Sequence, residues 1–213
     1  MAPNITIKYF DMRGRAEPLR LACAVGDIPF KDERVSFEEF GKMKERKELP
    51  FDQLPVMVVD GQTISQSGSI ERYLGKLTGL YPKDDLLKAA KIDEMIGATE
   101  DVANSIFKYR GKDEEKRKEA RKEFVEKDAP RFIEGFNRIC GKDDSKKYLC
   151  GDDMSIADLA LYFFTCCIKE GVFDHVPKDL FDSSPKILRS YKAVNEHPKV
   201  VEWNKAHPPK QKK

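Results

Sequence analysis

The stretch from Phe51 to Ser69 constrains the fold most, because it specifies a strand, a tight turn, a second strand and a helix start in close succession. Pro55 stands directly before the apolar run Val56-Met57-Val58-Val59, and the Asp60-Gly61 pair that follows favours a hairpin turn. A proline before a strand removes one N–H donor and, in a cis bond, turns the preceding backbone outward. We expect that backbone to form an edge with which a peptide can pair.

The residues after the hairpin predict a binding site for a carboxylate. Ser67 is placed to cap a helix that runs through Ile70 and Leu74 to Thr78. The first turn of a helix presents N–H groups and the positive end of a dipole, which suit an anion. The plain alternative for Ser67 is an N-cap with no ligand.

The first eighty residues predict a small α/β domain. Apolar residues alternate over 5–9 as in a half-buried strand, and a helix is expected over 15–24. A second strand over 31–35 and a short helix over 37–44 precede the hairpin. Strand–helix–strand units favour parallel pairing and hairpins favour antiparallel pairing, so we expect a mixed four-stranded sheet. We place the end of this domain at Pro82.

Beyond Pro82 the pattern is helical. Apolar residues recur at helical spacing over 92–107 and again over 124–139. The segment 112–123 is almost wholly charged with mixed signs, which indicates a solvated helix face or a loop that leads into one. We therefore assign 83–213 to an all-helical domain.

A capping box is predicted at the start of an apolar helix that ends near Ile168. Ser155 and Asp158 have the reciprocal spacing of that motif, with Asp where Glu or Gln is more usual. We interpret Asp158 as structural and not catalytic.

Charge and apolar patterning exclude several classes of partner. Lys and Arg number 39 against 37 Asp and Glu, a formal net charge of +2, so no overall field favours nucleic acid or an anionic membrane. No apolar run approaches the roughly 18 residues of a membrane span. The start, Met1-Ala2-Pro3-Asn4, lacks the basic and apolar regions of a secretory leader. We expect a cytoplasmic protein with small-molecule partners.

The cysteines and histidines do not predict a metal site. The five cysteines, of which Cys140 is one, include no Cys-x-x-Cys pair, which argues against both zinc and a disulfide framework. The three histidines lack the spacing of a metal-binding helix. We expect buried, reduced thiols and no metal.

Together, several motifs resemble the cytosolic glutathione S-transferases, most closely the sigma class and its invertebrate relatives, over nearly the whole chain. The motifs are Tyr9-Phe10-Asp11-Met12-Arg13-Gly14-Arg15-Ala16-Glu17, Leu49-Pro50-Phe51-Asp52-Gln53-Leu54-Pro55, Asp60-Gly61, Gln66-Ser67 and Ser155-Ile156-Ala157-Asp158. The resemblance implies a thioredoxin-like domain over 1–82 that binds glutathione, an all-helical domain over 83–213 that carries much of the electrophile site, and a homodimer.

The resemblance also implies the roles of individual residues. Tyr9 matches the catalytic tyrosine whose hydroxyl stabilises the thiolate of glutathione, the co-substrate, and Arg15 assists it. Leu54 matches the residue whose backbone pairs with the cysteinyl part of glutathione, and Pro55 is expected to be cis. The other implied glutathione contacts are Gln66 and Ser67 at the γ-glutamyl end, Gln53, Lys44 and Phe40 near the glycyl carboxylate, and Asp101 reaching across the dimer. A simple surface position remains the alternative for Lys44 and Asp101.

The apolar electrophile is expected to bind between the two domains. The residues we expect to line its site are Phe10, Met12, Gly14, Arg15, Ser105, Ile106 and Tyr109. Phe10 and Met12 have an alternative role as interface or core side chains.

Three departures from the family pattern affect these expectations. Phe40 stands where the sigma class usually has a tryptophan that donates to the glycyl carboxylate. The segment between Phe40 and Phe51 is longer than usual, so Lys42, Lys44 or Arg46 could each approach that carboxylate. Phe107-Lys108-Tyr109 replaces the aromatic-Pro-Trp sequence of vertebrate prostaglandin D synthase, which counts against prostaglandin isomerase activity.

The sequence predicts an enzyme that conjugates glutathione to hydrophobic electrophiles. A thiol–disulfide oxidoreductase of the same fold needs a cysteine after the first strand, and Asp11-Met12-Arg13-Gly14 contains none. The alternatives are a non-catalytic carrier of hydrophobic ligands, a crystallin-like structural protein and a glutathione-dependent prostaglandin isomerase. The joint presence of Tyr9, Gln66 and Ser67 favours the transferase.

Overall fold

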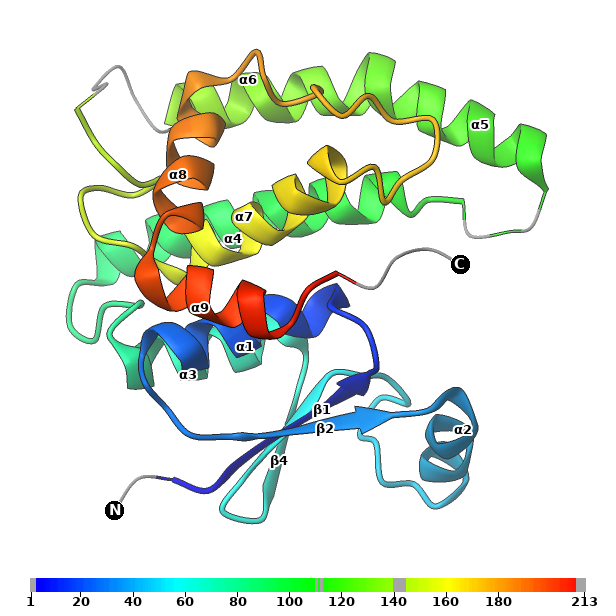
Figure 1. Cartoon of the computed structure of the whole chain (residues 1–213), viewed down its shortest axis with the longest axis vertical. Helices are drawn as coiled ribbons and strands as arrows, with labels where there is room; N and C mark the ends of the chain where they lie inside the picture. Colours follow the sequence, from blue (N-terminus) through cyan, green and yellow to red (C-terminus); the bar gives the residue numbers. More distant parts are fainter. Residues whose placement is uncertain (1–2, 110, 112, 140–144, 210–213) are drawn as a thin grey trace. The chain divides into compact units, whose positions relative to one another are not determined.

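The computed structural model describes residues 3–109, 111, 113–139 and 145–209 of the chain. The chain divides into two compact units, one of Met1–Pro82 with His197–Lys213 and one of Lys83–Glu196. We expected all of 83–213 to belong to the helical domain, whereas α9 (Pro198–Ala206) packs on α1 (Glu17–Val25) of the first unit. Each unit can be followed by its labels in Figure 1.

The first unit is built on a four-stranded mixed sheet with the strand order β2-β1-β3-β4. Its strands are β1 (Ile5–Phe10), β2 (Lys31–Val35), β3 (Val56–Val59) and β4 (Gln62–Ser65). β1 and β2 are parallel, and β3 is antiparallel to both β1 and β4. The predicted order of elements and the mixed pairing are confirmed.

The helices of the first unit follow the predicted segments, except at the starts of the first and third helices. The helix expected over 15–24 is divided into a 3₁₀ turn, η1 (Gly14–Ala16), and α1, which has a proline in its first turn. α2 (Phe37–Glu45) follows β2, and α3 (Ser67–Thr78) follows β4. α1 and α3 pack against each other on one face of the sheet (Figure 1). The fully buried side chains between helices and sheet include Ile5, Ile7, Leu19, Leu21, Met57, Ile70 and Leu74.

The prediction that Ser67 caps α3 is wrong. The cap position belongs to Gln66, whose backbone has a positive φ of 70°, and Ser67 is the first helical residue. β4 runs as far as Ser65, so the chain must turn from strand to helix within the single residue Gln66.

The second unit is helical, as predicted. Its central helix α7 (Ile156–Lys169) is buried along almost its whole length and packs against α4 (Leu86–Ile106) and α8 (Pro185–Asn195). The capping box of Ser155 and Asp158 is confirmed, and the Asp158 carboxylate also accepts hydrogen bonds from the Leu149 N–H (2.9 Å) and the Ser190 hydroxyl (2.7 Å). The helices are α4 (Leu86–Ile106), α5 (Glu114–Glu123), α6 (Ala129–Ile139), α7 (Ile156–Lys169) and α8 (Pro185–Asn195), with a π-helical turn, η2 (Phe124–Asp128), joining α5 to α6.

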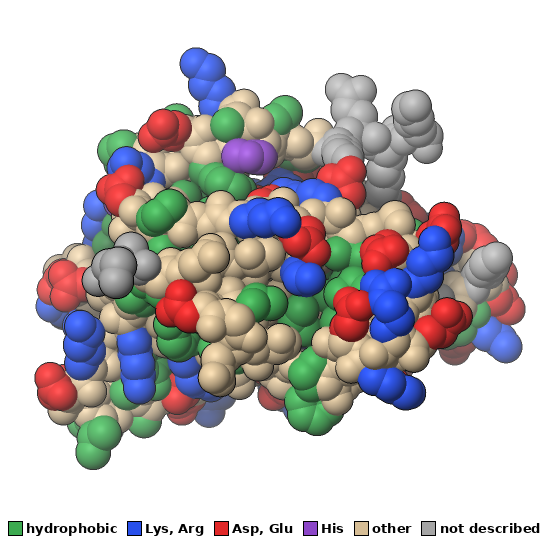
Figure 2. All heavy atoms as spheres, turned by 90° about the horizontal axis from the view of Figure 1, so that it is seen from below, with side chains coloured by type: hydrophobic (Ala, Val, Ile, Leu, Met, Phe, Trp, Pro, Cys, Tyr) green, Lys and Arg blue, Asp and Glu red, His purple; other side chains and the backbone are tan. Residues whose placement is uncertain are grey.

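The surface drawn in Figure 2 carries basic and acidic side chains interspersed with one another. None of the described helices is both long and apolar enough to cross a membrane. Over the same described residues, no group of three or more potential metal ligands comes together. Cys23 is buried, and burial raises the pKa of its thiol to about 12. Cys140 lies outside the described residues.

Candidate functional site

The sheet brings Tyr9, Pro55 and Gln66 side by side at one end of three neighbouring strands, in a row that we call the edge row. Lys8 is paired with Val56, and Val56 is paired with Ser65, so the next residues at that end of the three strands are Tyr9, Pro55 and Gln66. Neighbouring strands lie about 4.8 Å apart, so this edge row spans about 10 Å. The Leu54–Pro55 bond is cis, as the resemblance implied.

The Tyr9 side chain is fixed by the turn that follows β1. Only 8% of Tyr9 is exposed, and its hydroxyl oxygen accepts a hydrogen bond from the Arg15 N–H at 3.2 Å. Gly14 has a positive φ of 47°, and a Cβ atom there would lie 2.6 Å from the Tyr9 hydroxyl oxygen. The close approach of the turn to the phenol therefore requires glycine at position 14.

The start of α3 lies at the Gln66 end of the row. The Gln66 carbonyl accepts hydrogen bonds from the N–H groups of Ser69 (3.0 Å) and Ile70 (3.1 Å). The N–H groups of Ser67 and Gly68 precede these bonds and belong to the first helical turn. The helix start thus has the geometry that suits a carboxylate.

The α2 helix places Phe40 on the same apolar cluster as Leu54, the residue before the cis proline. Both side chains are partly buried against one apolar cluster, which consists of Val35, Met43, Leu49 and Val56. Gln53 is exposed in the segment just before Leu54. Phe40 therefore shares its apolar surroundings with Leu54, and Gln53 and Leu54 directly precede Pro55 in the chain.

The three basic side chains near Phe40 have different surroundings. Lys42 pairs with Glu38 at 2.6 Å, and Arg46 pairs with two glutamates, whose hydrogen bonds raise the pKa of its guanidinium. The Lys44 ammonium lies 4.8 Å above the Phe40 ring and has no carboxylate partner in the part of the chain that the structure describes. Of the three, Lys44 is the one whose charge is not already matched by an acidic side chain.

Phe10 follows Tyr9 and belongs to a group of aromatic rings. Its ring centroid lies 5.4 Å from that of Tyr9, 4.7 Å from Phe37 and 5.1 Å from Phe40. Phe10 therefore packs mainly on α2, whereas 45% of Met12 is exposed.

The remaining predicted residues lie at the C-terminal part of α4 and just after it, in the second unit. Asp101 is exposed, and the Ser105 hydroxyl donates to the Asp128 carboxylate. Ile106 is fully buried, which makes it a core residue of this unit. The Tyr109 hydroxyl accepts a hydrogen bond from the Asp113 N–H at 3.2 Å.

Two family models match the chain. The model described as "Glutathione S-transferase, N-terminal domain" matches residues 5–76, and the one described as "Glutathione S-transferase, C-terminal domain" matches residues 100–207. The chain belongs to the glutathione S-transferase family.

Similar proteins match this glutathione S-transferase along nearly its whole length. Glutathione S-transferase 4 of Caenorhabditis elegans is 32% identical over 210 residues, covering 94% of this chain and 95% of the relative. Human hematopoietic prostaglandin D synthase is 30% identical over 206 residues, covering 97% and 98%. The solved structure of prostaglandin synthase D from Nilaparvata lugens has a TM-score of 0.85 at 28% identity, covering 98% of this chain and all of that one.

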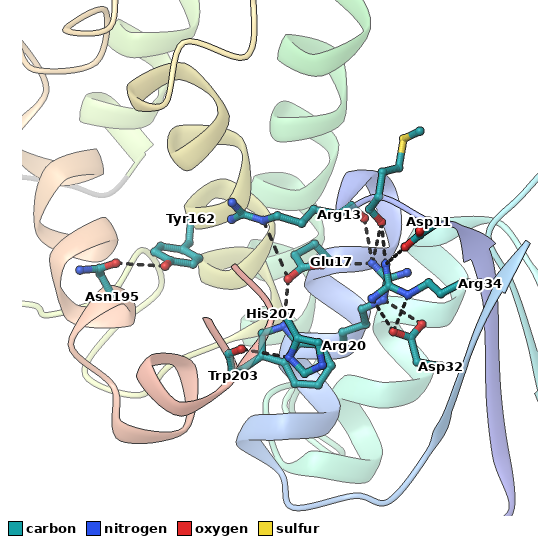
Figure 3. A network of polar contacts seen from close by, with 11 residues as sticks. Asp11, Arg13, Glu17, Arg20, Asp32, Arg34, Tyr162, Asn195, Trp203 and His207 are labelled. Atoms are coloured by element: carbon teal, nitrogen blue, oxygen red, sulfur yellow. Dashed lines mark hydrogen bonds and ion pairs between the residues drawn. The ribbon is translucent and has the colours of Figure 1, made fainter. Parts of the chain in front are cut away.

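The sequence did not predict an ionic network in the first unit, with Glu17 and Arg20 buried at its centre (Figure 3). Arg20 is fully buried and donates to the Glu17 carboxylate at 3.1 Å and to the carbonyl oxygens of Met12 and Arg13, each at 3.0 Å. One local signal could have found the pair, because Glu17 and Arg20 have helical i, i+3 spacing within an otherwise apolar helix.

The network extends to β2 and α9. Arg20 also donates to Asp32 at 3.1 Å, and Asp32 pairs with Arg34. The indole N–H of Trp203 donates to Glu17 at 2.9 Å. No local sequence pattern predicts the Trp203 contact, because its partner lies 186 residues earlier.

Proposed function

We propose that this chain is a glutathione transferase that joins the sulfur of glutathione to apolar electrophiles. The observation that carries the proposal is the Tyr9 hydroxyl, held by the Arg15 N–H at the edge shared with Pro55 and Gln66. Because the Tyr9 oxygen accepts that hydrogen bond, its own hydrogen can be donated to a thiolate. Membership of the family supports the same assignment.

The stabilisation that this chemistry needs matches what Tyr9 can supply. A thiol of pKa near 8.5 must drop by about two units to be mostly ionised at pH 7, which corresponds to about 2.7 kcal/mol. A hydrogen bond to a charged acceptor contributes about 1.5–3 kcal/mol. Arg15 and the positive end of α1 add to this effect.

The edge row is suited to the extended backbone of glutathione. We assign the cysteinyl part to the backbone of Leu54, which would pair with it as an added strand. Gln66 and Ser67 would hold the γ-glutamyl carboxylate, which the start of α3 supports through its N–H groups.

The glycyl carboxylate is assigned to Lys44 and Gln53. The ammonium of Lys44 is the best-placed charge on α2, because Lys42 and Arg46 already have acidic partners. The Phe40 ring would line the proposed site of the glycyl carboxylate, but it lacks an indole N–H donor. We therefore expect weaker binding of glutathione than with a tryptophan at this position.

The electrophile is assigned to the residues that the resemblance nominates. In the first unit these are Phe10, Met12, Gly14 and Arg15, and in the second unit they are Ser105, Ile106 and Tyr109. The full burial of Ile106 means that it would act through packing and not by direct contact. Holding both reactants together removes much of the barrier of a bimolecular reaction.

We further propose a cytosolic homodimer in which Asp101 approaches glutathione bound to the partner. Phe51 supports this assembly, because 62% of this large apolar residue is exposed. Sedimentation of wild type and Phe51→Ala tests it: a dimer that the substitution converts to monomer supports the proposal, and a wild-type monomer contradicts it.

The test of the function compares wild type with Tyr9→Phe, using a chlorodinitrobenzene as electrophile and titration calorimetry for glutathione. We expect Tyr9→Phe to bind glutathione but to lose about 10- to 100-fold in kcat, the loss that one charged hydrogen bond predicts. Tyr73→Phe on α3 is the matched control and should retain full activity. Wild type that binds glutathione without turnover would favour a hydrophobic-ligand carrier or a crystallin-like structural protein.

Prostaglandin isomerase activity is a second candidate, because the human relative and the Nilaparvata lugens structure described above are named prostaglandin synthases. Formation of prostaglandin D by the purified protein in the presence of glutathione would support it. The Phe107-Lys108-Tyr109 sequence leads us to expect little such activity.

A further inference from the structure

A chain of hydrogen bonds, buried between Glu17 and Arg20 and partly buried elsewhere, connects α9 with the segment that follows β1 (Figure 3). Trp203 Nε1 donates to Glu17 Oε1 at 2.9 Å, and Glu17 Oε2 accepts from Arg20 Nη1 at 3.1 Å. The same Arg20 nitrogen donates to the carbonyl oxygens of Met12 and Arg13. The chain therefore begins on the last helix and ends on the backbone just before Gly14.

That backbone segment positions the Tyr9 hydroxyl. Gly14 lies against the phenol, and the Arg15 N–H donates to its oxygen. We propose that Trp203 is a positioning residue for the transferase reaction and acts on Tyr9 through Glu17 and Arg20. The inference rests on the proposed function, in which Tyr9 stabilises the glutathione thiolate.

Glu17 transmits the effect because its carboxylate is buried and needs both of its donors. It is 1% exposed, and its Oε1 atom has the Trp203 indole at 2.9 Å and the Arg13 Nε only at 3.9 Å. Without the indole N–H, Oε1 loses its close donor, and a buried carboxylate in that state reorients toward the cations that remain. Those cations are Arg13 and Arg20, so the carbonyl contacts of Arg20 are disturbed.

The opposite side of Arg20 is already fixed. Arg20 Nε donates to Asp32, and Arg34 pairs with Asp32 and also donates to the Met12 carbonyl at 3.1 Å. A change at Glu17 is therefore transferred to the segment before Gly14 and is not absorbed at β2.

We expect α9 to stay docked without the indole N–H, because other contacts hold it. Lys199 pairs with Asp27 at 2.5 Å, and the Trp203 ring contacts the rings of Phe30 and His207, with centroids 5.9 and 3.8 Å away. Trp203→Phe keeps an aromatic ring in these contacts and removes only the donor. Lys199→Ala is the matched control, since it weakens the docking of α9 and leaves the Glu17 contacts intact.

The experiment measures the pKa of the glutathione thiol bound to wild type, Trp203→Phe and Lys199→Ala, from thiolate absorbance against pH, together with the pH profile of kcat/KM. We expect Trp203→Phe to raise the bound thiol's pKa by about half a unit to one unit and to lower kcat/KM about three- to tenfold at neutral pH. The kcat/KM profiles of wild type and Trp203→Phe should converge at high pH, where the bound thiol is ionised in both. Lys199→Ala should leave the thiol's pKa unchanged. Glu17→Gln, which also disrupts the chain, should raise it too.

Each outcome separates this inference from the proposed function. An unchanged thiol pKa in both Trp203→Phe and Glu17→Gln, or an equal rise in Lys199→Ala, overturns the positioning role. Wild type that ionises bound glutathione but conjugates no electrophile overturns the transferase function, and the thiolate comparison still decides the inference. Wild type that does not bind glutathione overturns both.

Discussion

Glu17 and Asp158 are both buried carboxylates in the first turn of a helix, yet their partners differ. Asp158 accepts hydrogen bonds from neutral donors on Ser155, Leu149 and Ser190, and burial raises the pKa of its carboxyl against the effect of these bonds. Glu17 is bound by the charged Arg20 and by the indole of Trp203. The contacts of Asp158 close a helix start, whereas those of Glu17 continue to the backbone beside Tyr9. Burial of a carboxylate therefore does not by itself distinguish the closing of a helix start from support of the segment beside Tyr9.

The largest effect on stability should come from Asp158→Asn. The NH2 group of the new amide would point at an N–H or hydroxyl donor, where the carboxylate oxygen now accepts a hydrogen bond. We therefore expect the free energy of unfolding to fall by about 3 kcal/mol. Urea denaturation measures it, and kcat/KM per folded molecule should stay at the wild-type value. Asp153→Asn, which alters an exposed pair with Lys88, is the control and should change stability by less than about 0.5 kcal/mol. A loss of kcat/KM in folded Asp158→Asn would remove the contrast with Glu17.

Gly14→Ala should show the opposite behaviour and reduce activity more than stability. The added Cβ would lie 2.6 Å from the Tyr9 hydroxyl, so the phenol must move, and we expect kcat to fall about 30-fold, or about 2 kcal/mol. Gly61→Ala is the matched control, because Gly61 also has a positive φ but has open space around its Cβ position. It should cost about 1 kcal/mol of stability and no activity. Equal activity of the two variants would show that the turn does not position Tyr9.

Ser190→Ala tests whether each neutral donor to Asp158 contributes only part of the stability of this cluster. It removes one donor at 2.7 Å, and we expect a loss of about 1 kcal/mol in the free energy of unfolding, measured by urea denaturation. Ser69→Ala, at an exposed position of α3, should change stability by less than about 0.5 kcal/mol. A loss of unfolding free energy as large as that of Asp158→Asn would mean that the Ser190 donor alone accounts for the stability of the cluster.

The smallest effect is the energetic coupling between the groups around Glu17 and the groups around Asp158, which we call the two carboxylate clusters. Trp203→Phe and Ser190→Ala share no partner, so the stability losses of the double variant should add to within about 0.5 kcal/mol. Thermal and urea denaturation of the four members of the cycle measure the coupling. A larger coupling energy would show that the two carboxylate clusters act as one unit.

The sequence predicted the features that local patterns encode. The hairpin at Asp60-Gly61, the capping box at Ser155 and the order of strands and helices all depend on residues close in the chain, and all are confirmed. The family resemblance supplied the cis bond before Pro55, which no local pattern required.

The features that were missed depend on three-dimensional placement. The turn at Gln66 displaced the cap that was expected at Ser67, because where β4 ends decides which residue must take the positive φ. The packing of α9 and the Trp203–Glu17 contact join distant segments, and pattern analysis of a single sequence does not detect such pairs. The closeness of Gly14 to Tyr9 was also hidden, because the glycine reads as an ordinary turn residue.

The edge row has a consequence for how this protein could be re-engineered. Tyr9, Pro55 and Gln66 are spaced by the hydrogen-bonded strands themselves, so the distances between them are set by the sheet. Phe37 and Phe40 stand on α2 and meet Phe10 only through ring contacts. Libraries that vary α2 can therefore change the aromatic surroundings of Phe10 while the row of Tyr9, Pro55 and Gln66 keeps its dimensions.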